Sequence, residues 1–367
     1  MDSLYWHNLS LILGKIFHMI SFLDMNSLKY CVIHKIGGGE EDKVIFSPEN
    51  FFPENEVLKK SLQNYFLSIF KEPEFFRFRE VGGSMELNPV FHLSSGVFET
   101  PENFYDTTKT LVNHLQAKSS HHLIKGGEVI CFYLKDVIVE DEAADAFGLI
   151  KLEEHESFLK IIQDDNGRFQ PIIDSGFQLS KPDKAYIVFN TERDLGFKIL
   201  QINHVAKSKE AVYWTESFLA IEPRNDHYFQ TKNYLQLTHD FIKERYNKGS
   251  EQDKSLKSEA LNNTKSYFKL ADSFDELTFT EQVFKDENVI SSFQNYKQAY
   301  EEQTRIEFSD HFEISSQAVK KQSRFFKSVL KLDKNFHIYI HGNREMIDKG
   351  IDENGRKYYI LYYNEES

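Results

Sequence analysis

Apolar residues in the first part of the chain recur with two different periods. In residues 55–70 they recur every three or four positions, which is typical of a helix that buries one side. Residues 102–117 repeat this spacing behind Pro101 and predict a second helix. Residues 28–36 and 74–80 are short apolar runs and are expected to be strands. The helical stripe of the first segment consists of Leu58, Leu62, Tyr65, Phe66 and Ile69.

From Gly126 onward the chain becomes a succession of short apolar runs. They read GGEVICFYLKDVIV, DAFGLIKL, SFLKIIQ, RFQPIID, KAYIVFN and GFKILQIN, and turn sequences such as DDNG and KPD separate them. Parallel strands need long crossover connections, and these links are too short to supply them. The pattern predicts an antiparallel meander with helices before it, which is an α+β fold.

After about residue 226 the strand pattern stops and helical spacing returns. Helices are expected over 226–247, 253–270, 274–286 and 289–303, followed by a helix over 315–332. Two strands, 336–341 and 357–363, then close the chain, with a DENG turn before the second. The predicted organisation is an α+β sheet domain over 25–225, a helical domain over 226–335 and a C-terminal hairpin over 336–367.

The first 24 residues differ from the rest of the chain. They are apolar, but Lys15 and His18 interrupt them, the start is acidic, and no small-residue cleavage site follows. A membrane helix needs about 20 predominantly apolar residues, and a signal peptide needs a basic start. Residues 1–24 are interpreted as an N-terminal extension, either a misassigned start or a loose helix. An anchor for a membrane or a partner is the alternative; no membrane contact is expected.

Composition adds that the protein is globular and acidic. Hydrophobic residues make up 40% and charged residues 28%, as in soluble domains, and the net charge is −13. Cys31 and Cys131 each lie within an apolar run, so both are expected to be buried free thiols. Free thiols are typical of a reducing cytosol, and the localisation expected is cytoplasmic.

One segment carries the opposite charge. Residues 317–344 hold seven Lys and Arg and one acid, Asp333, which gives +6 and leaves −19 for the rest. Lys320, Arg324, Lys327 and Lys331 follow at intervals of four, three and four, so a helix over 315–332 would place them on one face. Such a face suits nonspecific contacts with phosphates. The candidate DNA-binding residues are Lys320, Lys321, Arg324, Lys327, Lys331, Lys334 and Arg344.

Two observations oppose direct binding of nucleic acid. Acids elsewhere on the chain, for example in YEEQTRIEFSD, could pair with the basic side chains. The acidic remainder of the molecule would also weaken the attraction for a polyanion. The basic segment is therefore either a phosphate-binding surface or an internally neutralised helix.

No recognised catalytic motif appears in the sequence. There is no phosphate-binding G-x-x-x-x-G-K-[ST], no H-E-x-x-H, no C-x-x-C and no G-x-S-x-G. His337 and His341 would lie about 13 Å apart on one strand, too far to share a metal ion. We expect no catalytic residue, no metal site and no cofactor. A nuclease that holds Mg²⁺ through clustered carboxylates stays open as a less favoured reading.

Several strings resemble a known family. They are AVKKQSRFFKSVLKLDKNFHIYIHGNRE at 318–345, KGGEVICFYLKD at 125–136, DAFGLIKLE at 145–153, YIVFNTERDLGF at 186–197, YWTESFL at 213–219 and DHYFQTKN at 226–233. Together they resemble the bacterial nucleoid-associated proteins of the thirty-seven-kilodalton class, in their Bacteroidetes-like form. The likeness runs from about Met25 to the C-terminus, and residues 1–24 depart from it.

This resemblance implies a cytoplasmic protein of the nucleoid that contacts DNA and has no assigned reaction. It defines no DNA-contacting residue, so the basic helix remains an inference from charge and spacing. The leading hypothesis is nonspecific DNA contact through that helix without catalysis. The alternative is a protein-interaction module that reaches the nucleoid through a partner, and a homodimer is left open.

Overall fold

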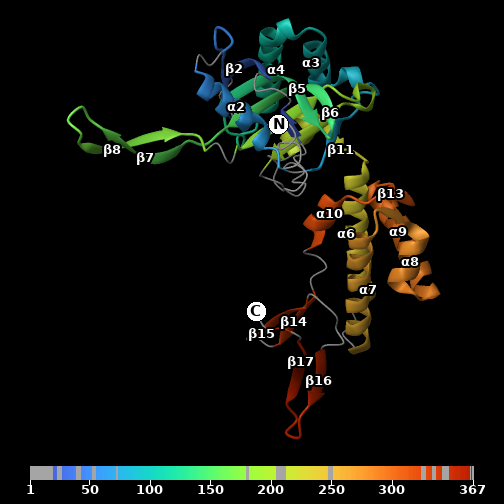
Figure 1. Cartoon of the computed structure of the whole chain (residues 1–367). Helices are drawn as coiled ribbons and strands as arrows, with labels where there is room; N and C mark the ends of the chain where they lie inside the picture. Colours follow the sequence, from blue (N-terminus) through green and yellow to red (C-terminus); the bar gives the residue numbers. More distant parts are fainter. Residues whose placement is uncertain are drawn as a thin grey trace, which may run out of the picture. The chain divides into compact units, whose positions relative to one another are not determined.

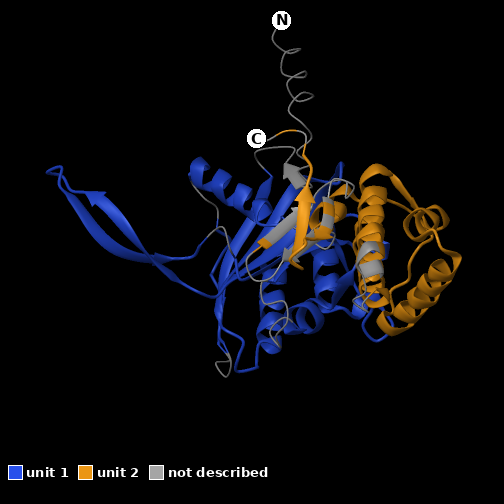
Figure 2. Ribbon diagram, turned by 90° about the horizontal axis from the view of Figure 1, so that it is seen from below, with its two compact units in different colours: residues 1–224 blue, residues 225–367 orange. Residues whose placement is uncertain are grey.

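The computed structural model describes residues 20–22, 27–38, 43–51, 55–71, 73–178, 182–203, 212–246, 251–323, 328–332, 336–340, 347–363 and 365. Its chain divides into two compact units, Met1–Arg224 and Asn225–Ser367, which we call unit 1 and unit 2 (Figure 2).

Unit 1 is built on an antiparallel sheet, which confirms the predicted α+β class. Within the described residues the sheet has nine strands in the order β11-β4-β10-β9-β6-β5-β2-β3, with β1 also paired to β5 (Figure 1). The strands are β1 Ile20–Phe22, β2 Leu28–Ile36, β3 Val44–Ile45, β4 Phe76–Phe78, β5 Gly127–Val139, β6 Glu142–Leu152, β9 Lys184–Phe189, β10 Lys198–Asn203 and β11 Ile221–Pro223.

Helices cover both faces of this sheet. Val129, Cys131 and Tyr133 of β5 belong to one core, whereas Phe132 and Leu134 belong to the core on the opposite face. Strands buried on both faces carry near-continuous apolar runs, as the sequence of β5 does. The first core lies under α3 Pro89–Glu99, α4 Phe104–Lys118 and the π-helix η4 Tyr213–Leu219, and the second under α2 Glu56–Ser68.

A glycine in β6 makes room for aromatic stacking in the second core. The Phe132 ring stacks on Phe66 of α2 with centroids 4.3 Å apart. A Cβ atom at Gly148 would lie 2.3 Å from the Phe132 ring. Because real carbon contacts are far longer, any side chain at Gly148 would displace that ring. The close approach of α2 to the sheet therefore depends on glycine at this position.

The predicted meander is interrupted by an arm. Strands β7 Glu156–Gln163 and β8 Phe169–Gly176 pair only with each other among the described strands, and β6 pairs directly with β9. The runs SFLKIIQ and RFQPIID are thus strands, as predicted, but they form a separate two-stranded ribbon (Figure 1). The inward-pointing backbone groups of this ribbon pair across the hairpin and the outward-pointing ones are open to water, so it can form without a place in the main sheet.

The end of the predicted N-terminal extension takes part in the sheet. Ile20–Phe22 forms β1 and pairs antiparallel with Val139, Ile138 and Val137 of β5. These three residues are therefore a strand rather than part of a loose helix. The proposed nature of residues 1–19 lies outside the described residues.

The two cysteines are buried free thiols, as predicted. Cys31 and Cys131 belong to the cores on opposite faces of the sheet. Burial raises the pKa of the Cys31 thiol to about 12 and that of Cys131 well above its usual value. Neither thiol is ionised at neutral pH, so both act as small apolar core residues.

Unit 2 packs helices around a third core. Tyr234 lies at its centre, with its ring 4.3 Å from that of Phe274 and 5.3 Å from that of Phe308. Aspartate side chains accept hydrogen bonds at the starts of three helices, which is the usual N-cap chemistry. The elements are α6 His227–Arg245, α7 Glu251–Leu270, β12 Ser273–Asp275, α8 Glu276–Phe284, α9 Glu287–Thr304 and β13 His311–Glu313, and the caps are Asp226, Asp275 and Asp286.

The structure confirms a hairpin in the C-terminal part of the chain, but the strands that pair are not the two that were predicted. Strands β16 Ile347–Ile351 and β17 Lys357–Leu361 pair across the predicted DENG turn. The predicted strand at 336–341 is β15 Phe336–Ile340, which pairs instead with β14 Ser328–Leu332. The segment expected to be the end of the basic helix is therefore a strand.

Candidate nucleic-acid interface

The start of the predicted basic helix is present as a short helix, α10 Ser316–Gln322. Ser315 is its N-cap, and its Oγ accepts a hydrogen bond from the Ala318 amide at 3.3 Å. The Ser315 amide donates to Thr231 Oγ1 of α6 at 3.0 Å, which ties the start of α10 to the core of unit 2.

One side of α10 is buried and the other is exposed. Ala318 and Gln322 are buried, and Val319 packs against the third core. Lys320 and Lys321 are exposed. This arrangement agrees with the expectation of a helix that packs on one side and presents cations on the other, but it extends over only two of the basic residues.

The basic helix predicted over 315–332 is wrong for Ser328–Leu332, which form a strand. Ser328–Leu332 pairs with Phe336–Ile340, and the register joins Leu332 to Phe336 across three residues. Two equal apolar runs separated by the polar triplet Asp-Lys-Asn are a hairpin signal, and Val, Ile, Phe and Tyr favour strands. Cross-strand pairing therefore overrides the helical spacing of the basic residues in this segment.

The structure therefore does not form the predicted helical face of four basic residues. Lys320 is on α10, whereas Lys331 is on β14 with its Cα opposite that of His337. Side chains on a helix and on a separate strand do not share a helical face. The predicted positions of Arg324, Lys327, Lys334 and Arg344 lie outside the described residues.

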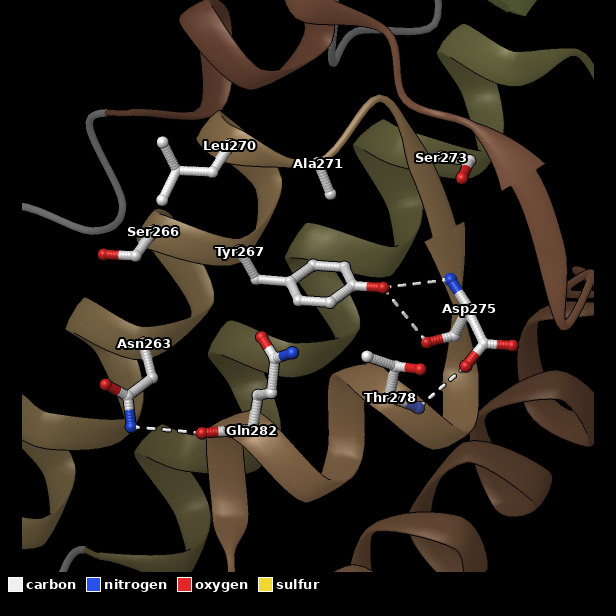
Figure 3. Close-up of a pocket in the computed structure, with 9 residues that line it drawn as sticks. All are labelled: Asn263, Ser266, Tyr267, Leu270, Ala271, Ser273, Asp275, Thr278 and Gln282. Carbon is white, nitrogen blue, oxygen red and sulfur yellow. Dashed lines mark hydrogen bonds between the residues drawn. The ribbon is translucent and has the colours of Figure 1, made fainter.

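A pocket of about 490 Å³ lies in unit 2, between α7 and α8 beside β12 (Figure 3). Its Tyr267 hydroxyl donates to the Asp275 carbonyl at 3.2 Å and accepts from the Asp275 amide at 3.0 Å. The Asp275 carboxylate accepts from the Thr278 amide, and hydrogen bonds from the Thr278 side chain and then from this amide lower the pKa of Asp275. The lining residues include no Lys or Arg, so the pocket offers no positive charge to a phosphate.

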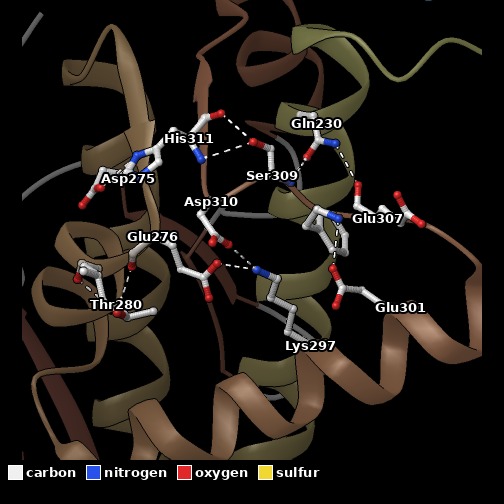
Figure 4. Close-up of polar contacts among 12 residues, drawn as sticks. Gln230, Asp275, Glu276, Thr280, Lys297, Glu301, Glu307, Ser309, Asp310 and His311 are labelled. Carbon is white, nitrogen blue, oxygen red and sulfur yellow. Dashed lines mark hydrogen bonds and ion pairs between the residues drawn. The ribbon is translucent and has the colours of Figure 1, made fainter.

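A lysine in unit 2 is neutralised inside the protein (Figure 4). Lys297 Nζ contacts the Glu276 carboxylate and lies 3.1 Å from Asp310 Oδ1. Burial raises the pKa of Glu276 and works against the charged form of Lys297. Although burial is the largest single influence on Lys297, the hydrogen bonds and charges of Glu276 and Asp310 together outweigh it and raise the pKa of this lysine. This cation holds α8, α9 and the start of β13 together and is not available to a polyanion.

Unit 1 contains two fully buried lysines that the sequence analysis did not single out. Lys151 and Lys184 are opposite each other on β6 and β9, and both donate to Glu153 Oε1, at 2.7 and 2.6 Å. Lys151 also donates to the Lys125 carbonyl at 2.6 Å. Burial lowers the pKa of Lys151. The signal available in the sequence was a lysine within an otherwise apolar strand. In the structure the two lysines form ion pairs with Glu153 at one end of the β6–β9 pairing.

Two further features were sought in the described part of the chain, a group of metal ligands and a membrane-spanning helix. Within the ranges given above, no three His, Cys, Asp or Glu side chains are grouped so that they could hold a metal ion. Among those same residues, no helix is long and apolar enough to cross a membrane.

The antiparallel sheet with its helices makes this an α+β protein, and the basic segment 317–344 is its most distinctive charge feature. Comparison with known families is more specific. The family model described as nucleoid-associated protein YejK matches residues 32–356, so the chain belongs to this family of nucleoid-associated proteins. No curated protein matches the chain.

Proposed function

We propose that this protein contacts nucleic acid directly and without sequence preference, through the basic segment 317–344. The observation that carries the proposal is the charge of that segment, +6 on a chain of −13, together with the exposure of Lys320 and Lys321 on α10. Membership of a nucleoid-associated family supports it. Under this proposal the protein is a cytoplasmic, nucleoid-bound component that needs neither a cofactor nor a catalytic residue.

The corrected geometry changes how the contact would be made. A short helix and a two-stranded ribbon follow each other in the chain, so the cations are distributed over two kinds of element. β-Ribbons as well as helices serve as DNA-contacting elements in other proteins. The contact proposed here is therefore a set of separate phosphate contacts, and among the candidate residues Lys320 and Lys321 are the two whose exposure is described.

The salt dependence of binding tests this proposal. Four to six phosphate contacts predict a slope of log K against log salt of about −4 to −5, because each contact releases about 0.9 of a counterion. Affinity for a fluorescent duplex should therefore fall by about two to three orders of magnitude between about 50 and 200 mM salt. The double variant Lys320→Glu/Lys321→Glu should weaken binding and reduce the slope by about two.

A matched control is available in α2 of unit 1. Lys59 and Lys60 are also adjacent lysines on a helix, and Lys59→Glu/Lys60→Glu produces the same change in net charge. This control should retain the slope of the unmodified protein. If the unmodified protein fails to bind at about 50 mM salt, or if both double variants lose the same affinity, direct contact through this segment is refuted.

A second function is supported by the charge of the whole molecule. The −19 outside the basic segment repels a polyanion, and a module that reaches the nucleoid through a partner protein avoids this repulsion. Such a module would co-purify with nucleoids from cells but would not shift naked DNA. Failure to bind duplex together with nucleoid association in cells would favour this reading.

A third reading, a nuclease, has the least support because no metal-binding group occurs among the described residues. Incubation of plasmid with the protein and Mg²⁺ or Mn²⁺ tests it, and it would require cleavage products.

A further inference from the structure

The β7–β8 arm exposes an unusual amount of apolar surface. Leu159 is 61%, Phe169 74% and Ile173 75% exposed, although all three lie in regular strands. Every residue from Glu156 to Gln163 and from Phe169 to Ser175 is exposed. Monomeric proteins rarely leave contiguous apolar strand surface in water, and isolated two-stranded hairpins are marginally stable. The arm therefore has the properties of a surface that another molecule covers.

The register divides these residues between two different faces. Leu159 is opposite Ile173, Ile161 is opposite Pro171, and alternation places all four on one face with Phe169. We call this the uncharged face, because its remaining members are also uncharged. Its residues are Ser157, Leu159, Ile161, Gln163, Phe169, Pro171, Ile173 and Ser175.

The opposite face of the arm has the mixed character of an ordinary solvated surface. Lys160 Nζ lies 3.9 Å from Asp174 Oδ2 on this charged face, and Glu156 is also on it. Its apolar side chains are less exposed than those of the uncharged face; Ile172, for example, is 37% exposed. The charged face is defined by Glu156, Phe158, Lys160, Ile162, Gln170, Ile172, Asp174 and Gly176.

We infer that the uncharged face packs against the same face of a second copy of this chain. This face offers no opposite charge to a phosphate or to an acidic or basic partner, so its apolar side chains favour an uncharged apolar partner. A second copy presents an equally uncharged apolar face, so a two-fold axis brings like surface onto like surface without burying a charge. The product would be a two-layer unit of four strands.

The size of the arm limits the strength of such a contact. Eight residues per strand give a length of about 27 Å, and two strands give a width of about 10 Å. One face then covers roughly 270 Å² per copy, below the roughly 800 Å² per partner of a standard interface. A reversible dimer that dissociates on dilution is expected. An arm longer than the screening length of about 10 Å also lets two chains of charge −13 meet away from their bodies.

Sedimentation equilibrium of the full chain, without DNA, tests this inference. The weight-average mass should rise from one copy toward two between about 1 and about 100 µM, the range in which small interfaces associate. Ile173→Glu should raise the dissociation constant at least tenfold, because it places a charge in the centre of the contact. The omission of DNA separates this result from the outcome of the salt titration.

Ile172→Glu is the matched control, with the same residue type, strand and change in charge. It lies on the charged face with Lys160 as its cross-strand neighbour, so the dimer should persist. Tryptophan fluorescence should show unchanged melting of unit 1 in both variants. A monomer at about 100 µM, or equal dissociation in both variants, overturns the inference. Flotation of that monomer with neutral phosphatidylcholine vesicles would assign the face to lipid instead.

Discussion

Acidification should destabilise unit 1 through one buried histidine. His34 of β2 is 2% exposed. The Ser47 amide donates to its Nδ1 at 3.3 Å, so Nδ1 is unprotonated, and Nε2 then carries the proton and donates to Thr108 Oγ1 at 3.1 Å. Burial, with a smaller contribution from Lys109, lowers the pKa of His34 to about 4. The neutral ring is therefore part of the folded state.

The direction of the pH effect follows from linkage. The unfolded chain takes up a proton at His34 near pH 6.5, whereas the folded chain does so only near the lowered pKa of about 4. Between these values the unfolded state binds more protons, so stability is present above about pH 6.5 and is lost as pH falls toward 4. Integration gives a loss of about 2 kcal/mol between pH 7.5 and pH 5.0 from this residue alone.

Urea unfolding followed by tryptophan fluorescence measures this loss in unit 1. Both tryptophans, Trp6 and Trp214, lie in the part of the sequence assigned to unit 1. Carboxylates also titrate in this range, so the informative quantity is the difference between the protein and its His34→Gln variant. That variant should lose about 2 kcal/mol less on acidification, whereas the exposed control His92→Gln should behave like the unmodified protein. Parallel pH profiles for all three proteins would refute the assignment.

Three further perturbations test the packing. Gly148→Ala should destabilise unit 1 by about 1 to 3 kcal/mol through overpacking against the Phe132 ring. Its control, Gly96→Ala, has open space around the Cβ position in α3 and should stabilise unit 1 by about 0.5 to 1 kcal/mol. Equal shifts in melting temperature for the two variants would contradict the stacking argument. Lys297→Met should cost about 3 kcal/mol by leaving the mostly covered Glu276 carboxylate without its cation, while Lys285→Met at an exposed pair should cost less than about 1 kcal/mol, as measured by circular dichroism of the helices. The two buried cysteines should react with a thiol reagent only after unfolding, and rapid labelling of the native protein would show that one of them is accessible.

The sequence alone determined the local elements wherever periodicity and caps agreed. Helices α2 and α4 lie within two residues of their predicted bounds, and α6, α8 and α9 of unit 2 begin at aspartate caps close to the predicted starts. Leu58 is the exception in its helix, because α2 leaves this member of the predicted stripe 44% exposed. Spacing identifies a helical face, but how much of that face is covered depends on the neighbouring elements. The charge of +6 in segment 317–344 is likewise fixed by composition.

Only the tertiary structure decided which partner each segment has. The helical spacing of Lys320 and Lys331 was compatible with one long helix, but pairing of β14 with β15 satisfies the backbone of that segment in another way. The sequence identified β7 and β8 but could not show that they leave the sheet, because their turns resemble those of a meander. Burial of Lys151 and Lys184 was equally hidden, since a lysine becomes tolerable in a core only when the fold brings a carboxylate such as Glu153 to it. Long-range contacts are set by the packing of the whole chain, and no local pattern specifies them.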